Sequence, residues 1–102
     1  MKYALHPEAA LEHEDQVAYD EARSAGLGRR YHAAFLSTLL RICDGPHRFK
    51  TIDPAGIRRV SLRGFPFAVI FREVEGVVRV LAIAPHRKRP SYWMPRSNRR
   101  KK

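Results

Sequence analysis

The chain has 102 residues, 44% of them hydrophobic, so it can build one small domain with a modest core. Its formal net charge is +10, and the excess lies entirely in the second half: residues 1–50 hold 7 Lys and Arg against 7 Asp and Glu, whereas residues 51–102 hold 13 against 3. This asymmetry favours contact with nucleic acid, an anionic membrane surface or an acidic protein; a solvated basic surface without a specific partner is the alternative.

Several chemistries lack the residues they need. Cys43 is the only cysteine, so the chain can form no internal disulfide and no thiolate metal site, which fits a reducing cytoplasm. The histidines before the C-terminal region show no metal-ligand spacing: His6, His13, His32 and His47. No motif indicates a cofactor, nucleotide hydrolysis or acyl transfer. Without a signal peptide or an apolar run of ~18 residues, we expect a soluble cytoplasmic protein and no membrane partner.

The first half predicts a short strand and a helix. Residues 2–6 are expected to form the strand, which stops at Pro7, a residue suited to the first turn of a helix. The helix is expected to run from Pro7 to about Ala25, because the segment contains neither Gly nor a further Pro. Its apolar residues at helical spacing are Leu11, Ala18, Ala22 and Ala25. Gly26 and Gly28 are expected to end it.

A second helix follows, with its apolar face on one side. The residues of that face recur at i, i+4, i+7, i+8 and i+11: Tyr31, Phe35, Thr38, Leu39 and Ile42. The turn Asp44-Gly45-Pro46 ends this helix. The two helices together predict a helical hairpin.

In the second half the hydrophobic period changes from 3.6 to 2. Residues 57–63 alternate as a half-buried strand does, and residues 65–71 are apolar on both faces, as in a central strand. Glu75-Gly76 predicts a tight turn, after which residues 77–84 form the last strand. The sequence therefore predicts an α+β domain: a short N-terminal strand, a helical hairpin and a three-stranded antiparallel meander, with the helices packed on one sheet face.

The domain is expected to comprise residues 1–93. Residues 94–102 are polar and carry five cations, so we expect a basic, flexible tail that a partner could order.

The basic residues of the second half are the candidates for binding. They are Arg58, Arg59 and Arg63 on the first strand of the meander, and Arg87, Lys88 and Arg89 after the last strand. Arg59 and Arg63 differ by an even number, so in a regular strand they share a face and can grip phosphates. The alternative is that these arginines lie over a solvated face or pair with Glu73 and Glu75.

Three residues near those cations could perform acid–base or stacking work. His86 beside arginines would stay neutral and available as a base, and Tyr92 or Trp93 could stack on a nucleobase. The alternative is that residues 90–93 form an apolar latch that folds back onto the domain, because Trp and Tyr usually bury their rings.

The order of these segments resembles the RelE/ParE superfamily of toxins from bacterial type II toxin–antitoxin systems, and within it the ParE-like plasmid-stabilisation branch. The resemblance covers residues 3–93. It rests on Tyr3, His6-Pro7-Glu8-Ala9, Gly26-Leu27-Gly28 with Phe35, Ile57-Arg58-Arg59, the run from Arg63 to Phe71, and Val80-Leu81-Ala82-Ile83-Ala84 followed by the run from His86 to Trp93.

The resemblance implies a basic toxin that an acidic cognate antitoxin holds inactive. RelE-like members cut mRNA in the ribosomal A site, whereas ParE-like members inhibit DNA gyrase. Where the nuclease branch places a catalytic arginine and a lysine, this chain has Ala68 and Ser61. Trp93 holds the terminal aromatic position and cannot transfer a proton. The nuclease set is thus absent unless replacements act: Arg59, His86, Arg87 and Tyr92.

We therefore expect a ParE-like gyrase inhibitor that acts by binding and is not itself an enzyme. The residues expected to contact the target or the antitoxin are Arg58, Arg59, Arg63, Arg87, Lys88, Arg89, Tyr92 and Trp93. The first alternative is a ribosome-dependent mRNA endoribonuclease, with the ribosome and mRNA as partners. The second is a basic binding module without toxicity.

Overall fold

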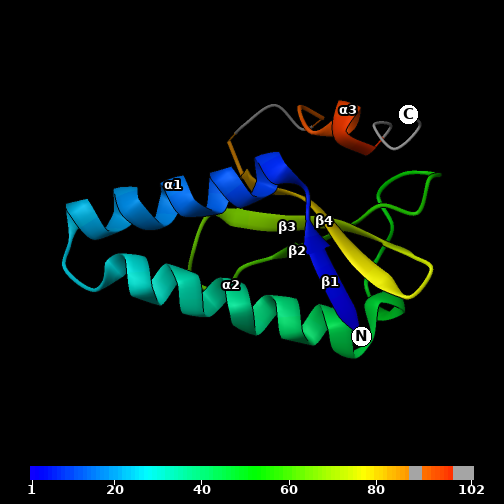
Figure 1. Ribbon diagram of the computed structural model, residues 1–102, viewed down its shortest axis with the longest axis horizontal. Helices are drawn as coiled ribbons and strands as arrows, with labels where there is room; N and C mark the ends of the chain where they lie inside the picture. The colour runs from blue at the N-terminus through cyan, green and yellow to red at the C-terminus, as the bar shows by residue number, and fades with distance from the viewer. Residues whose placement is uncertain (88–90, 98–102) are drawn as a thin grey trace.

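A helical hairpin packed against a four-stranded sheet is the main feature of the computed structural model, which describes residues 1–87 and 91–97 (Figure 1). The elements are β1 (Lys2–Leu5), α1 (Pro7–Arg23), α2 (Leu27–Asp44), a 3₁₀ turn (Pro46–Arg48), β2 (Arg58–Ser61), β3 (Phe67–Val74), β4 (Val77–Pro85) and α3 (Met94–Ser97). The expected α+β order is confirmed. No helix in the described part of the chain has the length and apolar character needed to cross a membrane.

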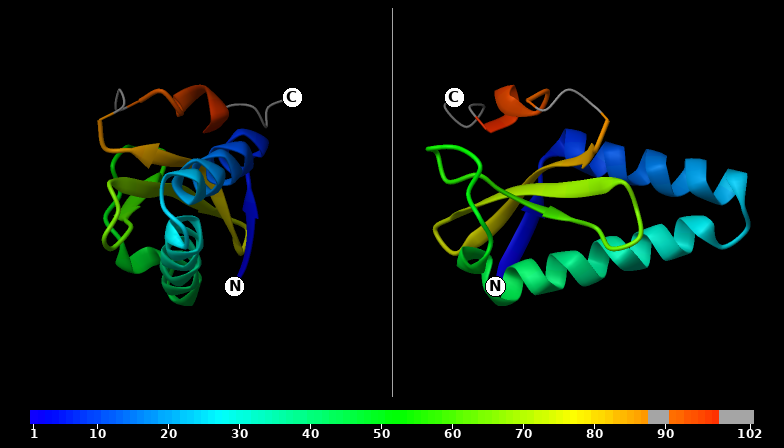
Figure 2. Two further views of the ribbon diagram at one scale, coloured as in Figure 1. Left: turned by 90° about the vertical axis from the view of Figure 1, so that its left-hand side faces the viewer. Right: turned by 180° about the vertical axis from the view of Figure 1, so that it is seen from behind.

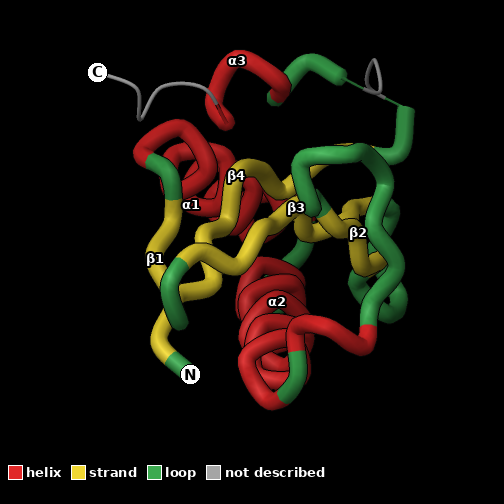
Figure 3. Tube along the Cα trace, turned by 90° about the vertical axis from the view of Figure 1, so that its right-hand side faces the viewer, coloured by secondary structure: helices red, strands yellow, loops and turns green. Residues whose placement is uncertain are grey.

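The sheet has the order β1-β4-β3-β2, so β3 and β4 are its inner strands. The strands β2, β3 and β4 form the expected antiparallel meander, and β3 and β4 are joined by a turn with positive φ at Glu75 and Gly76. β1 pairs in parallel with β4, ending where Leu5 faces Val80 (Figure 3). This pairing places the start of α1 beside the middle of β4.

A register shift in β4 decides which side chains reach the helices. Ile70 pairs with Ala82 and Phe71 pairs with Val80, so Leu81 is an extra residue in β4. Val80 and Ile83, which a regular strand would place on opposite faces, both join the core under the helices. Leu81 and Ala82 join a smaller cluster on the other face.

The buried face of α2 is the expected one, and Tyr31 and Ile42 are fully buried on it. The prediction that the regularly spaced apolar residues of α1 form its buried face is wrong. Leu11 is 57% exposed, and Ala18 and Ala22 are also exposed. The side that α1 turns to the core instead carries small and polar residues, including Ala9 and Asp20, since α1 packs against both α2 and β4 and meets polar partners there.

Gly28 does not end the first helix, contrary to expectation. α1 ends at Arg23, Gly26 lies in the connection with φ +86°, and Gly28 is buried in the first turn of α2. A Cβ atom on Gly28 would lie 2.4 Å from the Val17 carbonyl oxygen. Gly28 therefore allows the two helices to approach closely at the tip of the hairpin.

The C-terminal segment covers the sheet face opposite the helices. Figure 2 shows the sheet between α2 and this segment. Trp93 is only 3% exposed and packs with Ile57, Ile70 and Leu81. The chain then continues as α3, four residues that the sequence analysis assigned to the tail, because Arg96 anchors them to the domain. The remaining tail residues, 98–102, lie outside the described residues.

Candidate binding surface

We call the sheet face opposite the hairpin the tail-side face. It carries Arg59 and Ser61 of β2, Ala68 and Ile70 of β3, Leu81 and Ala82 of β4, and the segment 91–97 that lies over part of it. Its residues alternate along the strands with those that pack under the helices, such as Val60 and Val69. The tail-side face therefore presents polar and basic side chains from β2 next to an apolar patch covered by Trp93.

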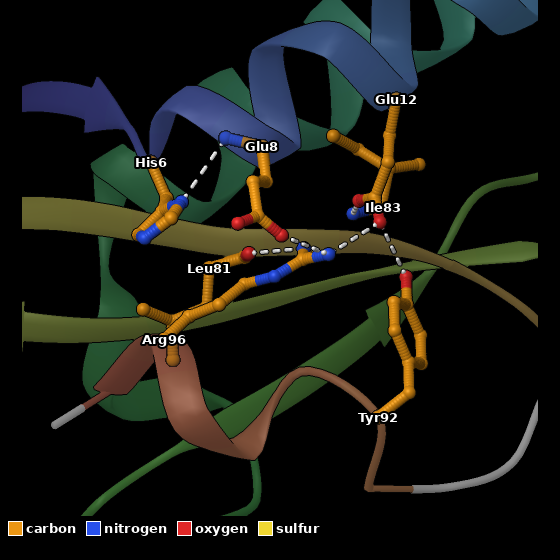
Figure 4. Close-up of polar contacts among 7 residues, drawn as sticks. All are labelled: His6, Glu8, Glu12, Leu81, Ile83, Tyr92 and Arg96. Carbon is orange, nitrogen blue, oxygen red and sulfur yellow. Dashed lines mark hydrogen bonds and ion pairs between the residues drawn. The ribbon is translucent and has the colours of Figure 1, made fainter. Parts of the chain in front are cut away.

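Arg96 fastens the C-terminal segment to this face (Figure 4). Its Nη1 donates to the Leu81 carbonyl at 2.9 Å, and its Nη2 donates to Glu12 Oε2 at 2.9 Å and lies 3.2 Å from Glu8 Oε1. The Arg96 side chain is 9% exposed, so these contacts are shielded from water. A charged group buried to this extent needs such partners, and loss of either carboxylate would leave part of the charge unpaired.

Glu12 completes the same network from α1. Its Oε1 accepts a hydrogen bond from the Ile83 N–H at 3.0 Å, and its Oε2 also accepts one from the Tyr92 hydroxyl at 2.9 Å. β1 pairs with β4 only as far as Val80. Glu12 and Arg96 thus satisfy backbone groups of β4 beyond the end of β1, and they tie α1, β4 and the C-terminal segment together.

The Tyr92 hydroxyl is poorly placed for acid–base chemistry. Burial raises its pKa, and the negative charge of Glu12 raises it further. The hydroxyl donates a hydrogen bond to Glu12 Oε2, and the Arg96 guanidinium lies over the ring at 5.1 Å. At neutral pH Tyr92 therefore acts as a neutral hydrogen-bond donor within the network.

Ser61 and His86 lie together at the other end of the tail-side face. Ser61 pairs with Ala68, Ala68 pairs with Ala84, and the Ser61 Oγ lies 3.5 Å from His86 Nε2. The His86 N–H donates to the Pro66 carbonyl at 2.9 Å. The small side chain of Ala68, between β2 and β4, leaves room for this contact.

Three of the arginines singled out from the sequence are available to a partner. Arg59, Arg63 and Arg87 are exposed, and none forms an ion pair within the described residues. The alternative that they pair with Glu73 and Glu75 is not observed among the described residues. Glu73 lies 4.0 Å from His47 and accepts from the Gly76 N–H, and Glu75 forms no ion pair with these arginines. These exposed guanidinium groups can meet an anionic surface without first breaking an ion pair.

Arg58 is held differently. Its guanidinium donates to the Phe49 carbonyl and lies 3.4 Å from His47 Nδ1. It therefore fixes the connection between α2 and β2. Lys88 and Arg89 lie outside the described residues.

Arg87 also lines a groove of about 580 Å³ at the end of β4. Tyr19 and Arg23 of α1 form one side of this groove, and Phe65 and Phe67 contribute to the other. The groove is thus bordered both by Arg87 and by residues near the tip of the hairpin, Arg23 and Leu27.

Sequence reasoning missed Glu12 and Arg96. The sequence assigns Glu12 no role and predicts that Arg96 lies in a flexible tail. Their contact joins residues 84 positions apart, so no local pattern signals it. The one available signal is that Glu8 and Glu12 are four residues apart and thus share a helix face.

Comparison with known proteins agrees with this architecture. Residues 3–90 match the family model described as ParE toxin of type II toxin-antitoxin system, parDE. No curated protein matches the chain significantly. The matched span includes α1, α2, β2, β3, β4 and β1 after its first residue, and it contains Arg59, Ser61, His86 and Arg87. The chain belongs to the ParE family of toxins of type II toxin–antitoxin systems.

Proposed function

We propose that this ParE-family toxin inhibits growth by binding DNA gyrase, and that an acidic cognate antitoxin neutralises it. Gyrase is favoured over the ribosome because this chain lacks positive charge at two positions where nucleases of the superfamily need cations. Ala68 is fully buried and Ser61 is engaged with His86, so neither position supplies a positive charge. Trp93, in the C-terminal segment, is buried against the sheet, and its indole cannot exchange a proton.

The exposed arginines are the residues that would make the contact. Arg59, Arg63 and Arg87 carry charge that no described carboxylate neutralises, and Arg87 borders a groove. Guanidinium groups bind carboxylates through paired hydrogen bonds, which suits an acidic partner surface. Arg58 and Trp93 are committed to contacts within the domain, so we assign neither of them a direct contact with the target.

The second candidate is a ribosome-dependent endoribonuclease. The contact between Ser61 and His86, with Arg59 exposed on the same strand, favours it, since an imidazole near exposed cations is a plausible base for RNA cleavage. The commitment of the Tyr92 hydroxyl to Glu12 speaks against it. A basic binding module without toxicity is the third candidate.

A direct comparison of the two targets tests the proposal. We expect the purified protein to inhibit supercoiling by gyrase and to leave mRNA on programmed ribosomes intact. Arg87→Ala should weaken the inhibition, whereas Arg29→Ala, at an exposed position on α2, should not. Robust A-site cleavage with gyrase unaffected would instead establish the nuclease candidate, and no effect in either assay would favour the module without toxicity.

A further inference from the structure

A second groove, of about 850 Å³, lies on the tail-side face away from Ser61 and His86. Apolar residues at the start of the chain form one wall: Ala4, Leu5 and Pro7. Arg72 of β3 and Arg79 of β4 contribute cations, and Arg96 borders the groove from α3. Three strands, the start of α1 and the C-terminal segment thus enclose a space of the size that small ligands occupy.

Arg72 and Arg79 are direct neighbours across the β3–β4 pair. They alternate with Phe71, Val78 and Val80 of the core, so both belong to the tail-side face. Like charges directly opposite each other in a sheet destabilise it. Some compensating interaction is therefore expected at this pair.

No acidic residue of the chain provides that compensation. Neither arginine forms an ion pair with a described residue, and the Nε of Arg72 is buried without a hydrogen-bond partner in the same part of the chain. All ten Asp and Glu residues precede residue 76 and lie within the described range. Arg96, in contrast, is neutralised by Glu8 and Glu12. Arg72 and Arg79 are therefore available to an anion from another molecule, although the groove lining also includes Glu73.

We propose that Arg72 and Arg79 bind a phosphoryl group of a nucleotide or of a nucleic-acid backbone. Two adjacent guanidinium forks match a doubly charged phosphate or two successive phosphodiesters, whereas one carboxylate needs only one fork. The apolar wall offers a surface for the sugar or base beside the phosphate.

The test uses the full chain with two probes, ADP and a labelled single-stranded hexanucleotide, at constant ionic strength. We expect the wild type to bind both probes. Fluorescence anisotropy reports binding of the labelled hexanucleotide, and thermal stabilisation of the protein reports binding of either probe. The double variant Arg72→Gln/Arg79→Gln should lose about tenfold or more in affinity, because it removes charge-assisted hydrogen bonds. Binding of the hexanucleotide alone would assign the site to a nucleic-acid backbone, and equal binding of ADP would assign it to a nucleotide.

The matched control is Arg29→Gln/Arg30→Gln, which removes the same charge from exposed positions on α2. It should bind within about twofold of the wild type, since only non-specific attraction is reduced. The Arg72/Arg79 variant should melt no lower than the wild type without ligand, because it relieves a like-charge pair. Equal losses in both variants, no binding by the wild type, or binding of an acidic peptide in place of both phosphate probes would overturn the assignment.

Discussion

In the C-terminal region, Trp93 has a structural role, and Arg87 is placed to contact a partner. Trp93 is 3% exposed and fills the cluster formed by Ile57, Ile70 and Leu81, whereas Arg87 is exposed at the rim of a groove. The sequence left two alternatives for Trp93: stacking on a nucleobase, or packing back onto the domain. The burial of Trp93 favours packing onto the domain. What remains to be measured is which residue the toxic activity needs.

We predict that Trp93→Ala costs roughly 3–5 kcal/mol of unfolding free energy, because it removes a large side chain from a packed cluster. Thermal or urea melts measure this loss. Met94→Ala, at the neighbouring exposed position, should change the melting temperature little. Arg87→Ala should also melt like the wild type but lose toxicity in a growth assay. A stable, non-toxic Trp93→Ala protein beside a toxic Arg87→Ala protein would show that the two roles are reversed.

At the scale of elements, the sequence predicted α2, the meander and the turn at Glu75-Gly76, because strict periodicity and turn residues are local signals. It failed for α1. The alanines and Leu11 at helical spacing face solvent, since the side of α1 toward the core carries Glu12 and Asp20. A periodic search for apolar residues cannot find a face that is buried through polar contacts.

The parallel pairing of β1 with β4, and the contacts of Arg96, were also beyond the sequence. Both join the two ends of the chain, and neither leaves a repeating pattern in either segment. The role of Gly28, which the sequence predicts to be a helix end, also depends on a contact between two separate segments. Its real role, close approach to Val17 of α1, depends on how the two helices cross.

A histidine pair crosses the interface of the helical hairpin. His13 Nε2 of α1 lies 2.8 Å from His32 Nδ1 of α2, and the His13 ring also packs on Tyr31 and Phe35. Burial, and to a lesser extent the neighbouring His32, lower the pKa of His13 to about 4. Protonation would add a buried N–H at Nδ1, which has no partner among the described residues.

Folding stability should therefore fall as the pH decreases from about 7 toward 4. In this window the unfolded chain, with a histidine pKa near ~6.5, binds the proton that the folded chain excludes. We expect a loss of about 1–2 kcal/mol, reduced from the full linkage value because the ring is only half-buried. Melts between pH 7.5 and 5 measure it. His13→Gln should flatten the profile, whereas His47→Gln, at an exposed position, should not; equal profiles for the two variants would contradict this origin.

At the scale of the whole molecule, the net charge of +10 comprises cations paired inside the domain and cations exposed on its surface. Glu8 and Glu12 are engaged internally by Arg96, so they neutralise a structural cation and not the surface of the meander. Arg59, Arg63 and Arg87 stay unpaired within the described residues. The surface presented to a partner is consequently more basic than a count of acidic residues suggests.

This distribution predicts how the protein would associate with the acidic antitoxin proposed above. Complementary charge accelerates encounter, and salt screens that acceleration once the Debye length falls below the size of the surface. We expect the association rate to fall about tenfold or more between ~50 mM and ~500 mM salt, while the dissociation rate changes less. Stopped-flow fluorescence measures both rates. Arg59→Gln/Arg63→Gln should lower the association rate at low salt and have little effect at high salt, where screening already removes the attraction. An association rate indifferent to salt would mean that shape and apolar contact, not the concentration of charge in residues 51–102, select the partner.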